Sequence, residues 1–351
     1  MNRNKFIVFS GLFAIAAAAF LLDLATGSVY IDPSVVFEIL LCQGKGQYHQ
    51  GWNDIVVLFR LPKAITAFIA GMALSVSGLM MQTLFKNPLA GPSVLGVTAG
   101  ASLGVALVVL GTGVGIEGSN VFTALGLRGN VLLMTASAIG AAVVMMLVLI
   151  LARRVQSVMT VLIVGVLGSL AINSVVSVLV HFSRPELIQS YLAWTFGSFA
   201  SVTWPQLRLF VPLCLLLIIV SFMLAKPLNG LLLGESYAMS MGIDFTMVRV
   251  MVLGTTAFLV GLVTAFCGPI AFIGIAVPHL ARASFRTSDH RVLIPGTALA
   301  GATTSLIADL AAQLPGSQAV LPLNAVTALL GSPVIIWFIL RRQARRDVPF
   351  I

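Results

Sequence analysis

Charged residues are scarce in this chain of 351 residues, and their scarcity argues against a soluble fold. Only 9% of the residues are Asp, Glu, Lys or Arg, whereas 59% are hydrophobic. A soluble domain carries about 25% charged residues and about 45–50% apolar ones. Together with a mean hydropathy of +1.06, this composition indicates an integral membrane protein.

Cysteine is equally scarce, and its spacing argues against two kinds of site. Cys42, Cys214 and Cys267 lie far apart with no C-x-x-C spacing, which argues against disulfides and against cysteine metal sites. The chain also lacks the phosphate-binding motif GxxxxGK[ST], because none of its lysines is followed by Ser or Thr. If ATP drives this protein, another chain must bind it.

Long apolar runs recur along almost the whole length, without the alternation typical of membrane β-strands. We predict an all-α polytopic membrane protein with about ten transmembrane helices, in a single transmembrane domain over residues 1–351. The expected spans are 6–25, 62–85, 93–113, 131–152, 158–181, 209–225, 248–267, 269–286, 293–312 and 322–340. The first run follows Arg3 and Lys5 as in a signal peptide, but its length favours an uncleaved helix.

The positive charges predict the orientation of the chain. With ten spans and both termini in the cytoplasm, the inside loops hold Arg3, Lys5, Lys86, Arg153, Arg154, Lys226, Arg249, Arg282, Arg286, Arg291, Arg341, Arg342, Arg345 and Arg346. The outside loops hold only Lys45, Arg60, Lys63, Arg128, Arg184 and Arg208. This excess follows the positive-inside rule. It also explains the formal net charge of +9 without nucleic-acid binding.

Three connections are too long to be simple turns. We expect two on the periplasmic side, at about residues 26–61 and 182–208, and one on the cytoplasmic side, at about 226–249. Tyr191 and Trp194 in the second are typical of a short helix at the level of the lipid headgroups. In the third, Gly234 and Gly242 interrupt apolar residues, which predicts two short surface helices.

Small residues recur at intervals of four on several spans. Gly96 and Gly100 belong to such a row on the third span, where close helix packing is the simpler explanation. On the fifth span the row contains Ser169, Asn173 and Ser177. These side chains are more polar than packing requires, so the row either packs against a neighbour or lines a translocation path.

Few ionisable side chains lie within the spans. They are Asp309, His279 and, near the end of a span, Asp23. A carboxylate in the membrane is a functional hypothesis by default, although Asp309 could equally hydrogen-bond a neighbouring helix. His279 has no second His or Cys at ligand spacing, so no metal site is predicted.

A series of short motifs runs through nearly the whole chain in a fixed order. They are Arg60-Leu61-Pro62, Gly78 with Gln82, Asn87-Pro88-Leu89-Ala90, Leu95-Gly96 with Gly100-Ala101, Leu233-Gly234 with Ala238 and Met241-Gly242, Gly268 to Gly274, Pro278-His279 with Arg282, Asp289-His290-Arg291 with Pro295-Gly296, Asp309, Leu321-Pro322, and Val326-Thr327-Ala328 with Gly331 and Pro333. In this order they resemble the FecCD family, the permeases of ABC importers for ferric siderophores, haem and vitamin B12.

The resemblance implies a type II ABC importer permease in a bacterial inner membrane, and not an enzyme. Two copies would form a homodimer with the translocation path between them. Two cytoplasmic ATPases would hold ATP and Mg²⁺, and a periplasmic or lipid-anchored binding protein would deliver the cargo. This chain would bind no cofactor and no nucleic acid, and would otherwise contact membrane lipids. The first expected cargo is an iron chelate of the ferric siderophore type, followed by cobalamin and then haem.

The resemblance also implies roles for particular residues. The segment 228–243 matches the family's coupling helices, which fit a groove on the ATPase. The expected coupling residues are Leu228, Leu231, Leu233, Gly234, Glu235, Ala238, Met241 and Gly242. The family's Arg-Leu-Pro-Arg corner docks acidic groups of the binding protein, and it corresponds here to Arg60 and Lys63. Lys63 lacks the planar fork of Arg. Three further positions depart from the family pattern: Gln313 stands where the family usually has a basic residue, Val320 where it has Glu, and Asn324 where it has Gly. Docking chemistry is therefore expected to differ.

Two other classes of protein fit parts of the sequence. A self-contained secondary carrier would need no ATPase, but the sequence shows no relay of membrane carboxylates. The surface-helix segment 226–249 also favours an external motor. A non-transporting membrane scaffold fits the apolar composition, but it leaves Asn173 and the serines around it unexplained.

Overall fold

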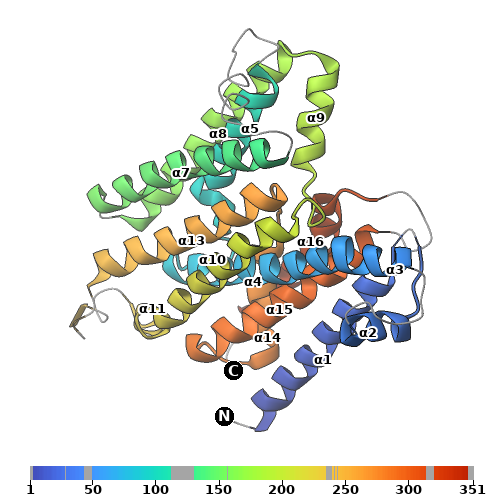
Figure 1. Cartoon of the computed structure of the whole chain (residues 1–351). Coiled ribbons are helices and arrows are strands. Elements are labelled where there is room, and N and C mark those ends of the chain that lie inside the picture. Colours follow the sequence, from blue (N-terminus) through green and yellow to red (C-terminus); the bar gives the residue numbers. More distant parts are fainter. Residues whose placement is uncertain are drawn as a thin grey trace.

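The computed structural model describes residues 3–27, 29–42, 50–111, 130–155, 157–234, 239–240, 242, 244–313 and 320–346. Seven of the described helices are long and apolar enough to cross a membrane (Figure 1). They are α1 (Arg3–Ala25), α4 (Leu61–Leu84, continuous with helical turns from Gly51), α7 (Asn130–Arg154), α8 (Val158–His181), α10 (Trp204–Met223), α13 (Phe245–Cys267) and α15 (His290–Ala312).

Three further helices coincide with the remaining predicted spans. They are α5 (Val97–Val109), α14 (Ile273–Phe285) and α16 (Leu323–Arg346). Each of the ten expected spans therefore corresponds to one helix, and the predicted all-α membrane fold is confirmed. Residues 268–272 form a non-helical joint between α13 and α14.

The three long connections contain short helices. The first holds α2 (Pro33–Cys42), α3 (Gln50–Asp54) and the π-helical turn η1 (Ile55–Arg60), the second holds α9 (Pro185–Thr195), and the third holds α11 (Ala225–Leu232). A 3-10 turn, η2 (Pro92–Leu95), precedes α5. The second surface helix expected between Gly234 and Gly242 falls largely outside the described residues.

Helix α4 lies at the centre of the bundle. Its apolar window is 83% buried, whereas the windows of α1 and α8 are 22% and 17% buried. Helices α10, α13, α14 and α15 pack around it (Figure 1). The sequence of α4 explains this position, because apolar or small residues occupy every face beyond its first turn, the pattern of a fully buried helix.

Small residues bring the helix backbones into direct contact. Gly71 of α4 faces the backbone of Gly301 in α15, and Gly78 faces the backbone of Gly274 in α14, with no room for a Cβ at either position. In the α5–α7–α8 layer, a Cβ at Gly100 would lie 2.5 Å from the carbonyl oxygen of Gly140. Packing therefore accounts for these small-residue rows.

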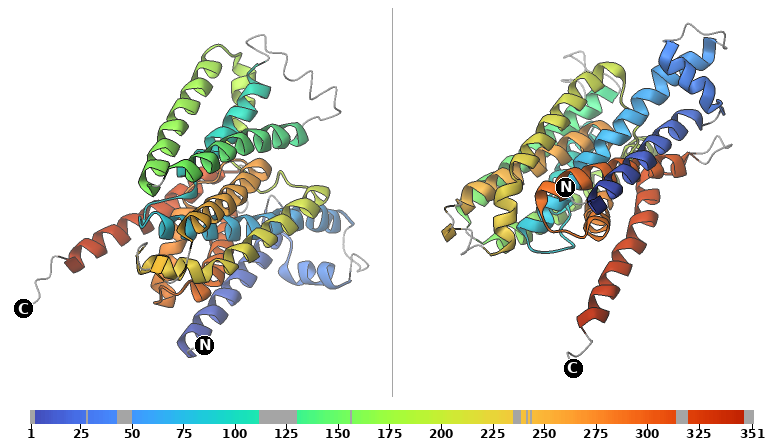
Figure 2. Two further views of the ribbon diagram at one scale, coloured as in Figure 1. Left: turned by 90° about the vertical axis from the view of Figure 1, so that its left-hand side faces the viewer. Right: turned by 90° about the horizontal axis from the view of Figure 1, so that it is seen from below.

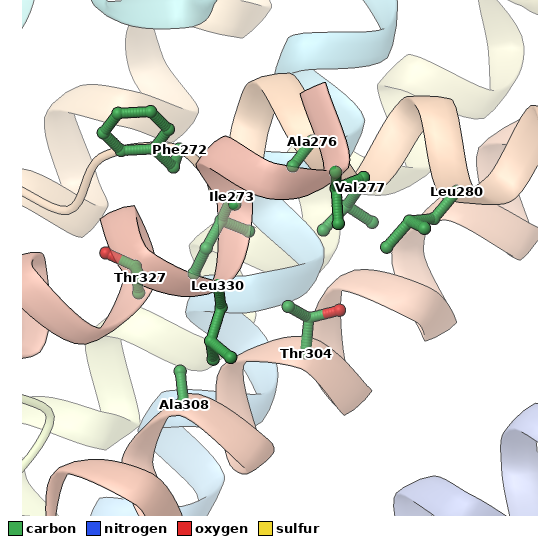
Figure 3. Close-up of a pocket in the computed structure, with 11 residues that line it drawn as sticks. Phe272, Ile273, Ala276, Val277, Leu280, Thr304, Ala308, Thr327 and Leu330 are labelled. Carbon is green, nitrogen blue, oxygen red and sulfur yellow. The ribbon is translucent and has the colours of Figure 1, made fainter. Parts of the chain in front are cut away.

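Helix α16 contacts the rest of the chain mainly through α14 and α15, and its C-terminal part projects from the body (Figure 2). Side chains of α14, α15 and α16 border a small apolar cavity where α16 leaves the bundle, among them Ile273, Thr304 and Leu330 (Figure 3). Leu329, Ile336 and other apolar side chains of α16 are exposed. This helix consequently presents an uncovered apolar surface.

Candidate functional site: polar clusters at both ends of the bundle

Four polar side chains meet where α1 ends, α4 begins and α15 ends. We term Asp23, Lys63, Asp309 and Gln313 the carboxylate–lysine cluster. Lys63 Nζ lies 3.2 Å from Asp23 Oδ1 and 2.8 Å from Asp309 Oδ2. Gln313 Nε2 donates to the same two oxygens, at 2.7 Å and 2.8 Å respectively. The side chain of Asp23 is fully buried and that of Lys63 is only 12% exposed. The cluster therefore ties α1 and α15 to α4.

Arg60 closes the C-terminal end of α1 beside this cluster. Its Nη1 donates to the carbonyl oxygens of Leu24 and Ala25, at 2.7 Å and 2.9 Å, and its Nη2 donates to that of Val29. The last carbonyl oxygens of a helix lack hydrogen-bond partners within the helix. A cation at this end is also stabilised by the negative end of the helix dipole. Arg60 is only 7% exposed, and its guanidinium binds carbonyl oxygens of the chain itself.

These contacts bear on the predicted docking of a binding protein. Arg60 and Lys63 stand at the expected end of α4, but both are engaged by partners within the chain. Docking through them stays a prediction, and it would require both side chains to leave those partners. Gln313, noted in the sequence as a departure from a basic residue, supplies an amide to both carboxylates. The sequence pattern carried no signal that these residues meet.

A second polar cluster joins α11, the start of α15 and the end of α4. We term Thr83, Asn229, Asp289 and His290 the histidine cluster. Asn229 Nδ2 donates to Asp289 Oδ1 at 2.7 Å, and Asn229 Oδ1 lies 2.8 Å from both the backbone N and Nδ1 of His290. His290 Nε2 lies 2.8 Å from Thr83 Oγ1. One amide on α11 thus contacts α15, and the imidazole extends the contact to α4.

Asp289 has a second function as the N-cap of α15. Its Oδ1 accepts the backbone N–H of Arg291 at 3.0 Å, as expected of an Asp before the first turn. The hydrogen bond from Asn229 is the main cause that lowers the pKa of Asp289, aided by the backbone N–H and charge of Arg291. The carboxylate is therefore ionised at neutral pH, beside the N-terminus of the helix that it caps.

The two clusters lie at opposite ends of the same helices. Lys63 and Thr83 are twenty residues apart on α4 (83 minus 63), which is about 30 Å at the rise of an α-helix. The hydrocarbon core of a bilayer is also about 30 Å thick. The separation of the two clusters therefore matches the thickness of a membrane, with the α4–α15 contact between them.

The expected coupling residues fall into three groups. Leu228 and Leu231 are buried, on the face of α11 that packs against α4 and α15. Leu233 is 64% exposed, and Gly234 and Gly242 both have positive φ angles, of +111° and +79°. Glu235, Ala238 and Met241 lie outside the described residues. The buried leucines anchor the segment, and only its exposed part is open to another protein.

The motif residues after α4 form the contact with α14. Gln82 accepts a hydrogen bond from Arg282 and donates to the carbonyl oxygen of Ile275 at 3.1 Å. The carbonyl oxygen of Pro88 accepts from His279 Nε2 at 2.8 Å. The imidazole of His279 also packs on the ring of Phe338, with centroids 4.1 Å apart. His279 therefore links the turn after α4 to α14 and α16.

The other motif residues shape local backbone. Asn87 Oδ1 accepts the backbone N–H of Leu89 at 2.9 Å and closes a turn. Gly96 adopts φ +79° between η2 and α5, a conformation that glycine adopts readily. Pro278 lies within α14. Within the described residues, no group of three or more His, Cys, Asp or Glu side chains is arranged to hold a metal ion.

The predicted path residues on α8 do not share one environment. Ser169 lies against Gly96 and donates to the carbonyl oxygen of Gly165 at 2.8 Å. Asn173 and Ser177 are exposed on the surface of this single chain. The Ser177 hydroxyl donates to the carbonyl oxygen of Asn173 at 2.9 Å, so the Asn173 amide is the main polar group available on that face.

Asn324 is a site residue that sequence reasoning did not assign. Its Oδ1 accepts the backbone N–H of Ala271 at 3.0 Å, and its Nδ2 donates to the carbonyl oxygen of Thr195 at 2.8 Å. It therefore ties the end of α9 to the joint before α14 at the start of α16. Its departure from the family's Gly was the only signal in the sequence.

Comparisons with known proteins agree on the kind of protein to which this chain is similar. The profile of the FecCD transport family matches residues 15–341. The vitamin B12 import system permease protein BtuC of Klebsiella pneumoniae subsp. pneumoniae is 36% identical over 336 residues, covering 95% of this chain and 94% of that protein. The protein of the same name from Escherichia coli O9:H4 is 35% identical over 327 residues, covering 93% and 92%.

A solved structure shares the arrangement of the helices. It is an inward-facing conformation of an ABC transporter provisionally assigned to the metal-chelate type, with a TM-score of 0.80 and 27% identity. The match covers 95% of this chain and 99% of that one. A second structure, PsaBC from Streptococcus pneumoniae in complex with Fab, has a TM-score of 0.50 and 15% identity, and supports the fold alone.

Proposed function

The chain belongs to the FecCD transport family and is a permease of an ABC importer, and we propose that two copies of it carry a metal chelate across the membrane. Cobalamin is the first candidate cargo, because the curated relatives at 35–36% identity are vitamin B12 permeases. The ferric chelate expected from the sequence is not confirmed. It remains the second candidate, supported by the likeness to the metal-chelate transporter.

The observation that carries this proposal is the extent of the match. A relative aligned over 95% of the chain and a family profile that matches residues 15–341 both span nearly the whole bundle. Cobalamin and ferric siderophores are both large complexes in which the chelator itself holds the metal. The permease therefore needs a wide path rather than ligands for the metal.

We propose that the path lies between two copies of the chain, with α8 at its wall. The window of α8 is only 17% buried within one chain, and its exposed surface combines Leu167 and Leu170 with Asn173 and Ser177. Helix α16 leaves apolar residues uncovered as well. A second copy would cover apolar surface while the Asn173 amide faces water in the path.

The cytoplasmic side of the proposed importer is the end with α11. The Lys and Arg distribution supports an orientation with 226–249 and both termini inside and with 26–61 and 182–208 outside. We propose that the exposed part of this segment, beginning at Leu233, contacts a separate ATPase that holds ATP and Mg²⁺. A binding protein would dock at the opposite face, near the carboxylate–lysine cluster.

Reconstitution tests both the mechanism and the cargo. The permease is purified with its ATPase in proteoliposomes, and the binding protein is added outside. Uptake of cobalt-labelled cyanocobalamin and of an iron-labelled ferric hydroxamate is then compared, with and without ATP. ATP-dependent uptake of cyanocobalamin supports the first cargo, and uptake of the ferric chelate alone supports the second. Uptake that continues without ATP would indicate a secondary carrier and overturn the proposal.

A further inference from the structure

The histidine cluster links α11 to α15 and α15 to α4 through directional hydrogen bonds, and we refer to this link as the joint. We propose that Asn229, His290 and Thr83 are positioning residues for transport, which make α11 move together with α4 and α15. The inference rests on the proposed function, because it takes α11 as part of the segment that contacts the ATPase. It adds the residues through which movement of that segment reaches the helices that cross the membrane.

The hydrogen atoms in this cluster can be placed from the partners. Asn229 Oδ1 faces the backbone N–H of His290, and its Nδ2 faces the Asp289 carboxylate, so the orientation of the amide is fixed. Because Oδ1 only accepts, His290 Nδ1 carries the proton and donates to it. In the neutral imidazole, Nε2 is then an acceptor. The single proton of the Thr83 hydroxyl has two acceptors in reach, His290 Nε2 at 2.8 Å and the carbonyl oxygen of Leu79 at 3.0 Å, and donation to Nε2 satisfies the ring. The chain of hydrogen bonds is complete with no charge on the ring.

Apolar contacts alone would not set the register of α11. Leu228 and Leu231 of α11 are buried. The hydrophobic effect that buries them is non-directional, so it would allow α11 to slide along its neighbours. Hydrogen bonds depend steeply on distance and angle. Asn229 lies between these two leucines in sequence, and it supplies the directional contacts to α15. It therefore fixes where α11 sits on the α15 terminus.

The cluster joins two helices that pack closely against each other along their length. Ser75 of α4 donates to the carbonyl oxygen of Thr297 in α15 at 2.9 Å, and the backbones of Gly71 and Gly301 are in contact. At the far end, Lys63 and Asp309 form an ion pair between the same helices. If α11 moves and displaces His290, the α4–α15 pair consequently carries this movement to the other face of the membrane.

The Thr83 hydroxyl gives the sharpest test, because its removal changes the shape of the side chain little. Thr83 and His290 are 4% and 1% exposed, so water cannot easily replace the lost hydroxyl. In Thr83→Val, His290 Nε2 loses its partner on α4. Thr83→Ser keeps the hydroxyl. Thr303→Val is the matched control, because buried Thr303 bonds only the carbonyl oxygen of Leu299 in its own helix.

The readout is the stimulation of ATP hydrolysis when the binding protein is added to the reconstituted complex without cargo. Docking at the outer face can reach the ATPase only through helices that cross the membrane, and the proposed joint connects the α4–α15 pair to α11. We expect Thr83→Val to lower the stimulation about fivefold, the effect of losing one net hydrogen bond. Thr83→Ser and Thr303→Val should keep the wild-type stimulation. Asn229→Ala should resemble Thr83→Val, and the double variant should be no worse than either single one.

Each outcome decides one of the two proposals. Wild-type stimulation in a folded Thr83→Val complex, or equal losses in Thr83→Val and Thr303→Val, would overturn the joint while leaving the importer assignment intact. Additive losses in the double variant would also overturn it, because both residues are inferred to act through His290. A wild-type complex that hydrolyses ATP without responding to the binding protein would overturn the proposed function, and the inference with it.

Discussion

Replacement of Lys63 by Met tests whether the carboxylate–lysine cluster holds the bundle together or serves mainly for docking. Met keeps most of the volume of the side chain and removes its charge. Asp23 and Asp309 then lose the ammonium group that lies 3.2 Å and 2.8 Å from them. Two carboxylates would share only the amide of Gln313. The structure therefore predicts a loss of stability.

The magnitude follows from the burial of the partners. Removing one member of a buried ion pair costs about 3–5 kcal/mol, because the remaining charge stays in a low dielectric. Lys63 is 12% exposed and Asp23 is fully buried, so partial access to water places the expected loss near the lower limit, at about 3 kcal/mol. Neutralising all three groups removes the unpaired charges. We therefore expect Asp23→Asn/Lys63→Met/Asp309→Asn to lie within about 1 kcal/mol of the wild type.

Unfolding of the purified permease in mixed micelles of mild detergent and SDS, followed by tryptophan fluorescence, measures these differences. Lys63→Arg keeps the charge and is the matched control. A Lys63→Met variant as stable as the wild type, or a triple variant no more stable than Lys63→Met, would refute the structural account. If Lys63 serves docking alone, the variant should instead weaken association with the binding protein and leave unfolding unchanged.

Three other predictions follow from the packing and the surfaces. Gly78→Leu should abolish folded protein in fluorescence-detected gel filtration, because the Gly274 backbone fills the space, whereas Gly168→Leu on α8 meets nothing within 4 Å and should fold. Ile at Gly234 and Gly242, where φ is positive, should leave ATP hydrolysis uncoupled from uptake, and unchanged uptake would reject the coupling assignment. The interface is tested in a chain from which the native cysteines have been removed. A short bismaleimide should link two copies that carry Asn173→Cys, but not two copies that carry Ser137→Cys, because Ser137 is buried. If both variants stay monomeric, the proposed interface is contradicted.

The sequence was sufficient to predict where the helices of the bundle lie, because a long apolar run can cross a membrane only as a helix when no β-barrel alternation is present. The sequence was less informative about what covers the apolar face of each helix. Leu228, Leu231 and Leu233 were all expected to couple to the ATPase, yet the first two are buried against α4 and α15. Periodicity identifies an apolar face, but it does not say whether that face packs within the chain or against another protein.

Polar clusters escape sequence analysis for a different reason. Gln313 and Asp23 are 290 residues apart in the chain, and nothing in a single sequence pairs them. Asp23, Asp309 and Gln313 were each noted separately, as a group near a span end, a membrane carboxylate and a departure from the family. The Asp289-His290-Arg291 motif was likewise noted without its partner Asn229. The helix packing brings these residues together, and only then does their chemistry become apparent.

The charges at the start of α4 explain why an amide is suited to position 313. The two carboxyl groups of Asp23 and Asp309 already face two basic side chains, Lys63 and the neighbouring Arg60. A third cation in so buried a place would lack a counterion, and an uncompensated buried charge is costly. Gln313 instead donates to both carboxylates without adding charge. The departure from the family's basic residue and the burial of Lys63 are therefore two parts of one arrangement, in which the end of α4 is closed by the chain itself.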